Sequence, residues 1–330
     1  MIGHHAFTNT GLKKIDIPAS VTKIGNYAFC NTKLERVVVP STVQTLDMEI
    51  FAGCDALKSV VLECPVVSSY SMFYGCENLK IEIAPTVTEL YGGWLNGAKN
   101  ATLYVTAGTL GAEGIEDYVE WGHSYVIMDK NYTGLQHMGN NVWYYKVNGI
   151  NQWNYTGLVK HSGSWYYVEK GVLNWNYTGL TNYCGTWYYV DKGILNWKYT
   201  GLTQYYGTWY YVEKGVLNWK YTGLTQYYGT WYYVDKGVLN WNYTGLTQYY
   251  GTWYYVQKGV LNWKYTGLTQ YYGTWYYVDK GVLNWKYTGL TQYYGTWYYV
   301  QKGILNWNYT GYVWHNGTRC YVKNGVWVQK

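Results

Sequence analysis

The chain has 330 residues, of which 13 % are charged and 21 % aromatic. That length suits two or more domains, and the absence of any run of 18 apolar residues predicts that no helix spans a membrane. The start, MIGHHAF, lacks the basic segment followed by an apolar segment that marks a signal peptide.

Charge is divided unevenly along the chain. Residues 1–128 hold 8 Lys/Arg and 13 Asp/Glu, a net charge of −5, whereas residues 129–330 hold 17 and 6, a net charge of +11. We therefore predict two domains, 1–128 and 129–330. The basic half favours an anionic partner through its summed field, with cell-wall polymer, nucleic acid and membrane surface all left open by the charge alone.

The first domain repeats with a period of about 22 residues. Four phenylalanines follow each other at that spacing, Phe7, Phe29, Phe51 and Phe73, and short apolar segments recur with the same period. One such unit cannot bury its own apolar face, so we expect neighbouring units to stack into a solenoid. Free cysteines are among the most buried residues, and we expect core positions rather than disulfides for Cys30, Cys54 and Cys76.

The motifs IGHHAF, IGNYAF, FAGCDAL and FYGCENL, with the strands IDIP and VVVP, resemble leucine-rich repeats of the BspA-like type over about residues 1–105. The resemblance implies a right-handed solenoid with a strand-lined concave face, in a bacterial surface protein that is often an adhesin. Residues 103–122 resemble a closing unit, a last strand followed by a short helix. The first unit starts in mid-pattern. We therefore expect this sequence to be truncated at its N-terminus and the natural protein to extend upstream, where any export signal would lie.

The second domain is an array of Trp/Tyr repeats. Trp-Tyr-Tyr begins at eight positions from Trp143 to Trp297, each 22 residues after the last, and a second tryptophan follows ten residues later. In one unit, 208–212 is strongly β-prone, 213–215 supplies a turn, and 216–222 alternates as a strand does. We predict a β-hairpin from these segments, closed by Thr-Gly and stacked with its neighbours into an all-β solenoid. The fold class is thus mainly β, with two solenoids in tandem.

The rings have two possible roles. With so little Leu, Ile and Val in the array, Trp and Tyr can form the core, since each buries roughly 150–250 Å². Ring faces can also bind a quaternary ammonium or the apolar face of a sugar. A weak site repeated many times gains avidity of roughly 10²–10⁴ over one site.

The pattern G-x-WYY-[VL]-x-x-G followed by TG is similar to the choline-binding, or cell-wall-binding, repeats of Gram-positive surface proteins and to the related glucan-binding repeats. The resemblance covers about 200 residues and implies a hairpin solenoid that anchors a protein non-covalently to wall polymer. Where the choline pattern has Trp after TG, this chain has Leu, for example Leu202 and Leu224. Choline, a teichoic-type polymer and a glucan therefore all stay open as ligands.

Only the Trp and the second Tyr of WYY carry over from the resemblance as ligand-binding residues. They are Trp165, Tyr167, Trp187, Tyr189, Trp209, Tyr211, Trp231, Tyr233, Trp253, Tyr255, Trp275, Tyr277, Trp297 and Tyr299. We infer from the residues that the second tryptophan of each unit supplies a further platform. These are Trp197, Trp219, Trp241, Trp263 and Trp285.

Other classes of function find little support. The six histidines form no HExxH, and there is no GxSxG, Walker or Rossmann motif, so we predict no catalytic residues, no metal and no cofactor. One or two lysines per repeat and almost no arginine argue against single-stranded nucleic acid as a partner.

We predict a non-enzymatic protein of the bacterial cell surface, secreted and held on wall polymer by residues 129–330. Residues 1–128 would then be presented to a host or partner protein. The alternatives are an adhesin fragment whose aromatic array is only a spacer, or the targeting half of a larger wall hydrolase or toxin.

Overall fold

The computed structural model describes residues 1–113, 115–116 and 122–328. The chain forms two compact units, Met1–Asn176 and Tyr177–Lys330, which we describe separately. Both are built from β-strands, as predicted, and the described residues contain no α-helix. The sequence boundary at 128/129 lies within the first unit and stays a prediction.

The first unit is built on a parallel sheet of five strands, β2 (Arg36–Val39), β4 (Ser59–Leu62), β6 (Lys80–Ile83), β8 (Thr102–Thr106) and β9 (Ser124–Met128). Two short parallel pairs lie beside it. They are β1 (Lys23–Ile24) with β3 (Thr45–Leu46), and β5 (Val66–Val67) with β7 (Glu89–Leu90). A 3₁₀ helix, η1 (Leu110–Ala112), follows β8 where a short helix was expected, and residues 114 and 117–121 of that expected closing unit lie outside the described residues.

Stacked phenylalanines form the spine of this solenoid. Phe7, Phe29, Phe51 and Phe73 lie with ring centroids 5.2, 5.4 and 5.8 Å apart and nearly parallel planes, and Trp94 closes the row edge-on at 6.1 Å. One ring per 22-residue turn is what a ladder of identical units requires. The thiols of Cys54 and Cys76 lie in the same core and donate to backbone carbonyl groups, so both fill the core as expected. Cys30 is only half-buried.

The first aromatic hairpin covers part of the strand face of the five-stranded sheet. It consists of β10 (Gly134–His137), β11 (Trp143–Val147) and the short β12 (Ile150–Asn151). Tyr144 is fully buried against Val61 and Tyr104, and its hydroxyl bonds with that of Ser59 at 2.9 Å. The concave face that we expected to be open to a partner protein is thus partly occupied by the chain itself.

A buried ion pair lies in the same contact. Lys146 Nζ donates to Glu82 Oε1 at 2.5 Å, with side chains 2 % and 1 % exposed, and Asn151 Nδ2 donates to the same oxygen at 3.0 Å. The indole of Trp153 donates to Glu63 Oε1. Burial is the larger influence on Glu63 and raises the pKa of its carboxyl, against the lowering effect of the indole bond. The rest of this unit is β13 (Gly157–His161), β14 (Ser164–Glu169) and β15 (Val172–Leu173).

The second unit repeats one three-stranded motif. Each motif has two long antiparallel strands and one short strand. They are β16 (Gly179–Tyr183), β17 (Thr186–Asp191) and β18 (Ile194–Leu195); β19 (Gly201–Tyr205), β20 (Thr208–Glu213) and β21 (Val216–Leu217); β22 (Gly223–Tyr227), β23 (Thr230–Asp235) and β24 (Val238–Leu239); β25 (Gly245–Tyr249), β26 (Thr252–Gln257) and β27 (Val260–Leu261); β28 (Gly267–Tyr271), β29 (Thr274–Asp279) and β30 (Val282–Leu283); β31 (Gly289–Tyr293), β32 (Thr296–Gln301) and β33 (Ile304–Leu305); and β34 (Gly311–His315), β35 (Thr318–Lys323) and β36 (Val326–Trp327).

The predicted hairpin of 208–212 with the segment from Val216 is present but short, and a longer hairpin is formed by the stretch GLTQYYGTWYYV. The WYY strand β20 pairs along its length with the preceding GLTQY strand β19, Leu202 opposite Tyr211, and only its end pairs with β21. The predicted strand 216–222 stops after Leu217. Asn218 ends it, because its side-chain oxygen accepts the backbone N–H of Lys220 at 2.9 Å and folds a turn.

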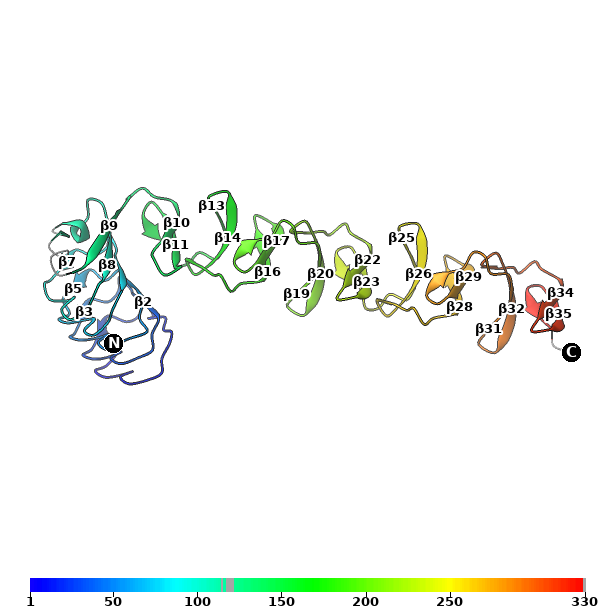
Figure 1. The fold of residues 1–330 in the computed structure, drawn as a ribbon, viewed down its shortest axis with the longest axis horizontal. Coiled ribbons are helices and arrows are strands. Elements are labelled where there is room, and N and C mark those ends of the chain that lie inside the picture. Colours follow the sequence, from blue (N-terminus) through cyan, green and yellow to red (C-terminus); the bar gives the residue numbers. More distant parts are fainter. Residues whose placement is uncertain (114, 117–121, 329–330) are drawn as a thin grey trace. The chain divides into compact units, whose positions relative to one another are not determined.

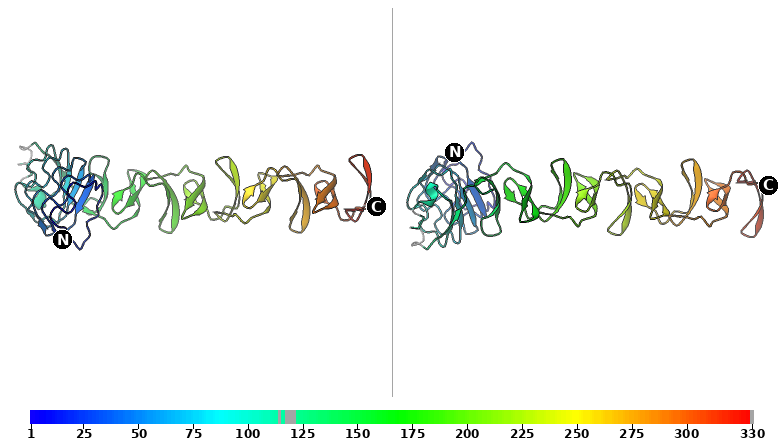
Figure 2. Two further views of the ribbon diagram at one scale, coloured as in Figure 1. Left: turned by 90° about the horizontal axis from the view of Figure 1, so that it is seen from below. Right: turned by 90° about the horizontal axis from the view of Figure 1, so that it is seen from above.

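Successive motifs are joined by one more strand contact, Tyr210 opposite Val238 in the next motif. Within this unit the β19–β20 hairpin points to one side and the β25–β26 hairpin to the opposite side (Figure 1). The views in Figure 2 show in profile the hairpins that face the viewer in Figure 1. Each motif therefore offers its own copy of the same surface features.

Candidate functional site

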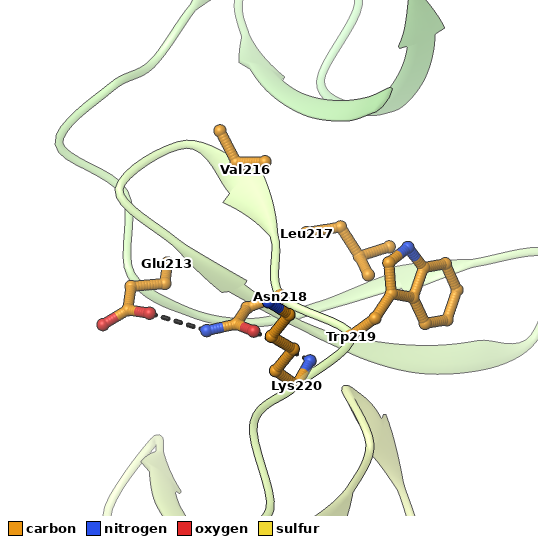
Figure 3. Close-up of a pocket in the computed structure, with 6 residues that line it drawn as sticks. All are labelled: Glu213, Val216, Leu217, Asn218, Trp219 and Lys220. Carbon is orange, nitrogen blue, oxygen red and sulfur yellow. Dashed lines mark hydrogen bonds between the residues drawn. The ribbon is translucent and has the colours of Figure 1, made fainter. Parts of the chain in front are cut away.

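A shallow hollow lies beside the second tryptophan of two repeats, Trp219 and Trp307. In one repeat it is a hollow of about 360 Å³ lined by Glu213, Val216, Leu217, Asn218, Trp219 and Lys220. Strand β21 places the apolar wall and the turn after it presents the indole ring, with the carboxylate and amide across from it (Figure 3). A hollow of about 520 Å³ lies at the equivalent place around Trp307.

The indole ring is the exposed surface of this pocket. Trp219 is 51 % exposed, and its five other copies in the second unit range from 49 to 51 %, whereas Trp153 and Trp175 are half-buried. Trp219 packs edge-on against Tyr210, the middle residue of WYY, at 5.8 Å, so the ring is held in place although half of it faces solvent. Sequence reasoning found these tryptophans, and the last copy, Trp307, belongs with them.

Polar groups surround the ring in a fixed arrangement. Asn218 Nδ2 donates to Glu213 Oε2 at 2.7 Å while Asn218 Oδ1 holds the turn. Lys220 also lines the hollow (Figure 3). An apolar ring face bordered by hydrogen-bonding groups is the usual composition of a small-molecule site. The sequence analysis did not single out Asn218 or Lys220, although both follow the repeat period.

The WYY residues divide into two groups by exposure. The first tryptophan is half-buried in every copy from Trp165 to Trp297. Trp209 packs edge-on against Tyr227 of the next repeat at 5.0 Å, and Tyr227 against the exposed Tyr228 at 4.5 Å. This row of three rings was not predicted, because the two tyrosines before each GTWYY segment, such as Tyr227 and Tyr228, were not considered as platforms.

The second tyrosine of WYY is a core residue in most copies. Tyr211 is 7 % exposed and stacks face to face on Tyr221 with centroids 3.8 Å apart, and Tyr167, Tyr233, Tyr255, Tyr277 and Tyr299 are also buried. Tyr189 is half-buried in the same stack. The face of a buried ring is not open to a ligand, so we assign these tyrosines a supporting role.

The partner ring of this stack locks the repeat. Burial, with a smaller effect of the neighbouring phenol of Tyr277, raises the pKa of Tyr287 to about 12. The hydroxyl therefore keeps its proton and donates to the backbone oxygen of Leu290 at 2.7 Å. The leucine that stands where the choline pattern has tryptophan, Leu202 or Leu224 for example, is buried beside this stack. It builds core and no cage wall.

The described residues contain no group of three or more His, Cys, Asp and Glu side chains placed to hold a metal ion. In the part of the chain that the structure covers, no helix has the length and apolarity needed to cross a membrane.

Tandem hairpins of this kind define a modular β-hairpin repeat protein. The chain belongs to the choline-binding repeat family, whose profile matches eight successive segments, 154–174, 176–196, 198–218, 220–240, 242–262, 264–284, 286–306 and 308–326. Residues 1–102 match a BspA type leucine rich repeat region in six copies. Both families consist of binding repeats and not of catalytic domains.

No curated protein matches the chain. Among solved structures, the chain is similar to an alternansucrase in complex with isomaltotriose, at 20 % identity and a TM-score of 0.24, over 48 % of this chain. The chain spans 13 % of the length of that enzyme.

Proposed function

We propose that this protein sits on a bacterial cell surface, where its aromatic array binds cell-wall carbohydrate without a covalent link. The observation that carries the proposal is the same half-exposed indole in six successive repeats of the second unit, each with polar residues at the equivalent positions around it. One binding site would serve an isolated small ligand. Six copies suit a polymer that repeats its own recognition unit, because linked weak sites gain avidity.

Folding alone does not account for the exposed rings. A hairpin solenoid needs an apolar core, and Leu202, Val212, Leu217 and the Tyr211–Tyr221 stack supply it. The Trp219 ring leaves half of its surface in water in every copy, where a Lys or Gln would serve solubility better. Half-exposed aromatic rings at equivalent places are typical of a surface that takes up a ligand.

Residues 1–128 contribute an interaction surface in this proposal. The strand face is partly covered by the hairpin that carries Tyr144, so a host or partner protein would meet another surface. Met48, Tyr70, Tyr74 and Tyr91 are large, apolar and about half exposed, and they occur on the turns between strands. We propose these turns as the adhesive side.

Sedimentation with purified Gram-positive cell walls tests the anchoring role. The full chain should pellet with the walls, and a variant with Trp219, Trp241, Trp263, Trp285 and Trp307 changed to Ala should stay largely in solution. The matched control changes five equally regular exposed rings, Tyr206, Tyr228, Tyr250, Tyr272 and Tyr294, to Asn. Thermal melting of both variants separates a lost pocket from a lost fold. Equal pelleting of the tryptophan variant and the full chain would refute the proposal.

A further inference from the structure

The residues that line the hollows beside Trp219 and Trp307 have equivalents in all six repeats of the second unit, from Trp197 to Trp307. We call these six sets of residues the pockets of the second unit. Their tryptophan, asparagine and leucine do not change, whereas two polar positions on the rim do. The position of Glu213 is occupied, in chain order, by Asp191, Glu213, Asp235, Gln257, Asp279 and Gln301. The position of Lys220 is occupied by Lys198, Lys220, Asn242, Lys264, Lys286 and Asn308. These two positions therefore carry both charges, one charge of either sign, or none, around an unchanged ring, and Lys302 also lines the hollow beside Trp307.

The changes preserve hydrogen-bonding capacity while they alter charge. Gln257 accepts from Asn262 at 2.7 Å as Glu213 does from Asn218, so an amide replaces a carboxylate in the same bond. The shorter Asp235 instead accepts from the Thr222 hydroxyl at 3.4 Å. Where aspartate occurs, the asparagine amide is not engaged by the carboxylate and can donate to a ligand.

A quaternary ammonium does not fit this series. Ammonium recognition relies on several ring faces around the cation, and the lining of the pocket contains one ring, Trp219. The Gln257 pocket has no carboxylate on its rim and keeps Lys264. A cation would meet repulsion there without a compensating charge.

A phosphate group fits no better. Four of the six pockets keep a carboxylate at the rim position, Asp191, Glu213, Asp235 and Asp279. A carboxylate beside a bound anion opposes binding through like-charge repulsion. Anion sites usually have an arginine or a lysine at such a position. The net positive charge of residues 129–330 is thus a property of the whole array and not of the pocket.

We propose that each of these pockets binds an uncharged sugar residue. The C–H face of the sugar ring lies on the indole of Trp219, and ring hydroxyls bond with Asn218 and with whichever carboxylate or amide stands opposite. This inference rests on the proposed function, since it names the ligand class of the same array. Hydroxyls both donate and accept, so they tolerate Glu, Asp, Gln, Lys and Asn on the rim, whereas a charged ligand does not.

A full-chain variant with all four carboxylates made amides separates the three ligand classes. The changes are Asp191→Asn, Glu213→Gln, Asp235→Asn and Asp279→Asn. For a neutral sugar, affinity for purified walls should change by less than about threefold, because an amide oxygen accepts the same bond. If the ligand were an ammonium group, the affinity for walls should clearly fall. If it were a phosphate group, the affinity should rise by roughly tenfold or more, because the repulsion from the carboxylates is removed. Either of those results would overturn the inference.

Competition on the unaltered chain gives an independent answer. Neutral oligosaccharides released from the same walls, freed of charged fragments by ion exchange, should release the bound protein. Choline chloride and poly(glycerol phosphate) should not. If choline or poly(glycerol phosphate) released the protein and the neutral oligosaccharides did not, the anchoring role would stand and the sugar proposal would be rejected. Failure of the chain to bind walls at all would reject both.

Discussion

At the residue scale, the contact between the leucine-rich repeats and the first aromatic hairpin depends on one buried and one half-buried carboxylate. Glu82 meets Lys146 and Asn151, and Glu63 meets the indole of Trp153. Lys146 stands where the other repeats have a fully buried valine, such as Val168 or Val212. This hairpin is therefore adapted to its neighbour.

Changing Lys146 to Met should destabilise the first unit by about 3–5 kcal/mol, because it leaves Glu82 buried without its counter-charge. The double change Lys146→Met with Glu82→Leu should recover much of that loss, since two apolar side chains replace the pair. Urea unfolding followed through the first unit measures both. A loss below about 1 kcal/mol for the single change would show that the pair is hydrated, as surface pairs are.

Glu63 makes stability depend on pH in the opposite sense to a salt-bridged carboxyl. Its folded-state pKa lies above the ordinary value of 4.5 because burial disfavours the charge. The folded state thus binds the proton more tightly, and stability should fall as pH rises from 4.5 through the raised pKa. Glu63→Gln should flatten this dependence and raise the melting temperature at pH 7. A wild-type melting temperature that rises over the same interval while the variant stays level would contradict this.

At the scale of the element, the hairpin tip is the least expected feature. Tyr206 has φ of 45° and is followed by Gly207 with φ of 81°, a turn that favours Asn-Gly. The tyrosine is also 91 % exposed. Ordinary turn residues, Ser162 and Asn316, take this place at the two ends of the array. Neither burial nor turn geometry favours tyrosine here.

Changing the five tip tyrosines to asparagine should not lower the melting temperature of the array. Asparagine adopts positive φ more readily than tyrosine, and the ring contact it removes, Tyr205 with Tyr206, is mostly in solvent. Differential scanning calorimetry measures the outcome. A drop of several degrees would mean that the tip rings stabilise the fold.

At the scale of the whole molecule, much of the architecture could be predicted from the sequence, because repeats repeat their contacts. The Phe7–Phe73 ladder and the WYY strands followed from spacing alone. Which of its two neighbours the WYY strand pairs with over the greater length did not, since Leu217, Trp219 and Tyr221 alternate as convincingly as Leu202 and Thr203 do. The covered strand face was signalled only by Lys146, a charge at a valine position, and its partner Glu82 is 64 residues away.

The candidate site was predictable in part for the same reason. The period located five of the six half-exposed tryptophans of the second unit, Trp197 to Trp285, but not how far each ring of WYY is buried, because that depends on stacking between segments such as Tyr211 and Tyr221. The rim residue Asn218 lay inside the predicted strand 216–222, because an alternating pattern does not show that its side chain folds a turn instead.

The most direct test of a multivalent array is wall affinity measured against the number of intact indole pockets. Pairs of pocket tryptophans are changed to alanine in the full chain, first Trp197 with Trp307, then Trp219 with Trp285, then Trp241 with Trp263. We predict a stepwise fall that totals roughly 10²–10⁴ when all six are gone, because avidity is lost pocket by pocket. An affinity that stays constant through the whole series would contradict the account.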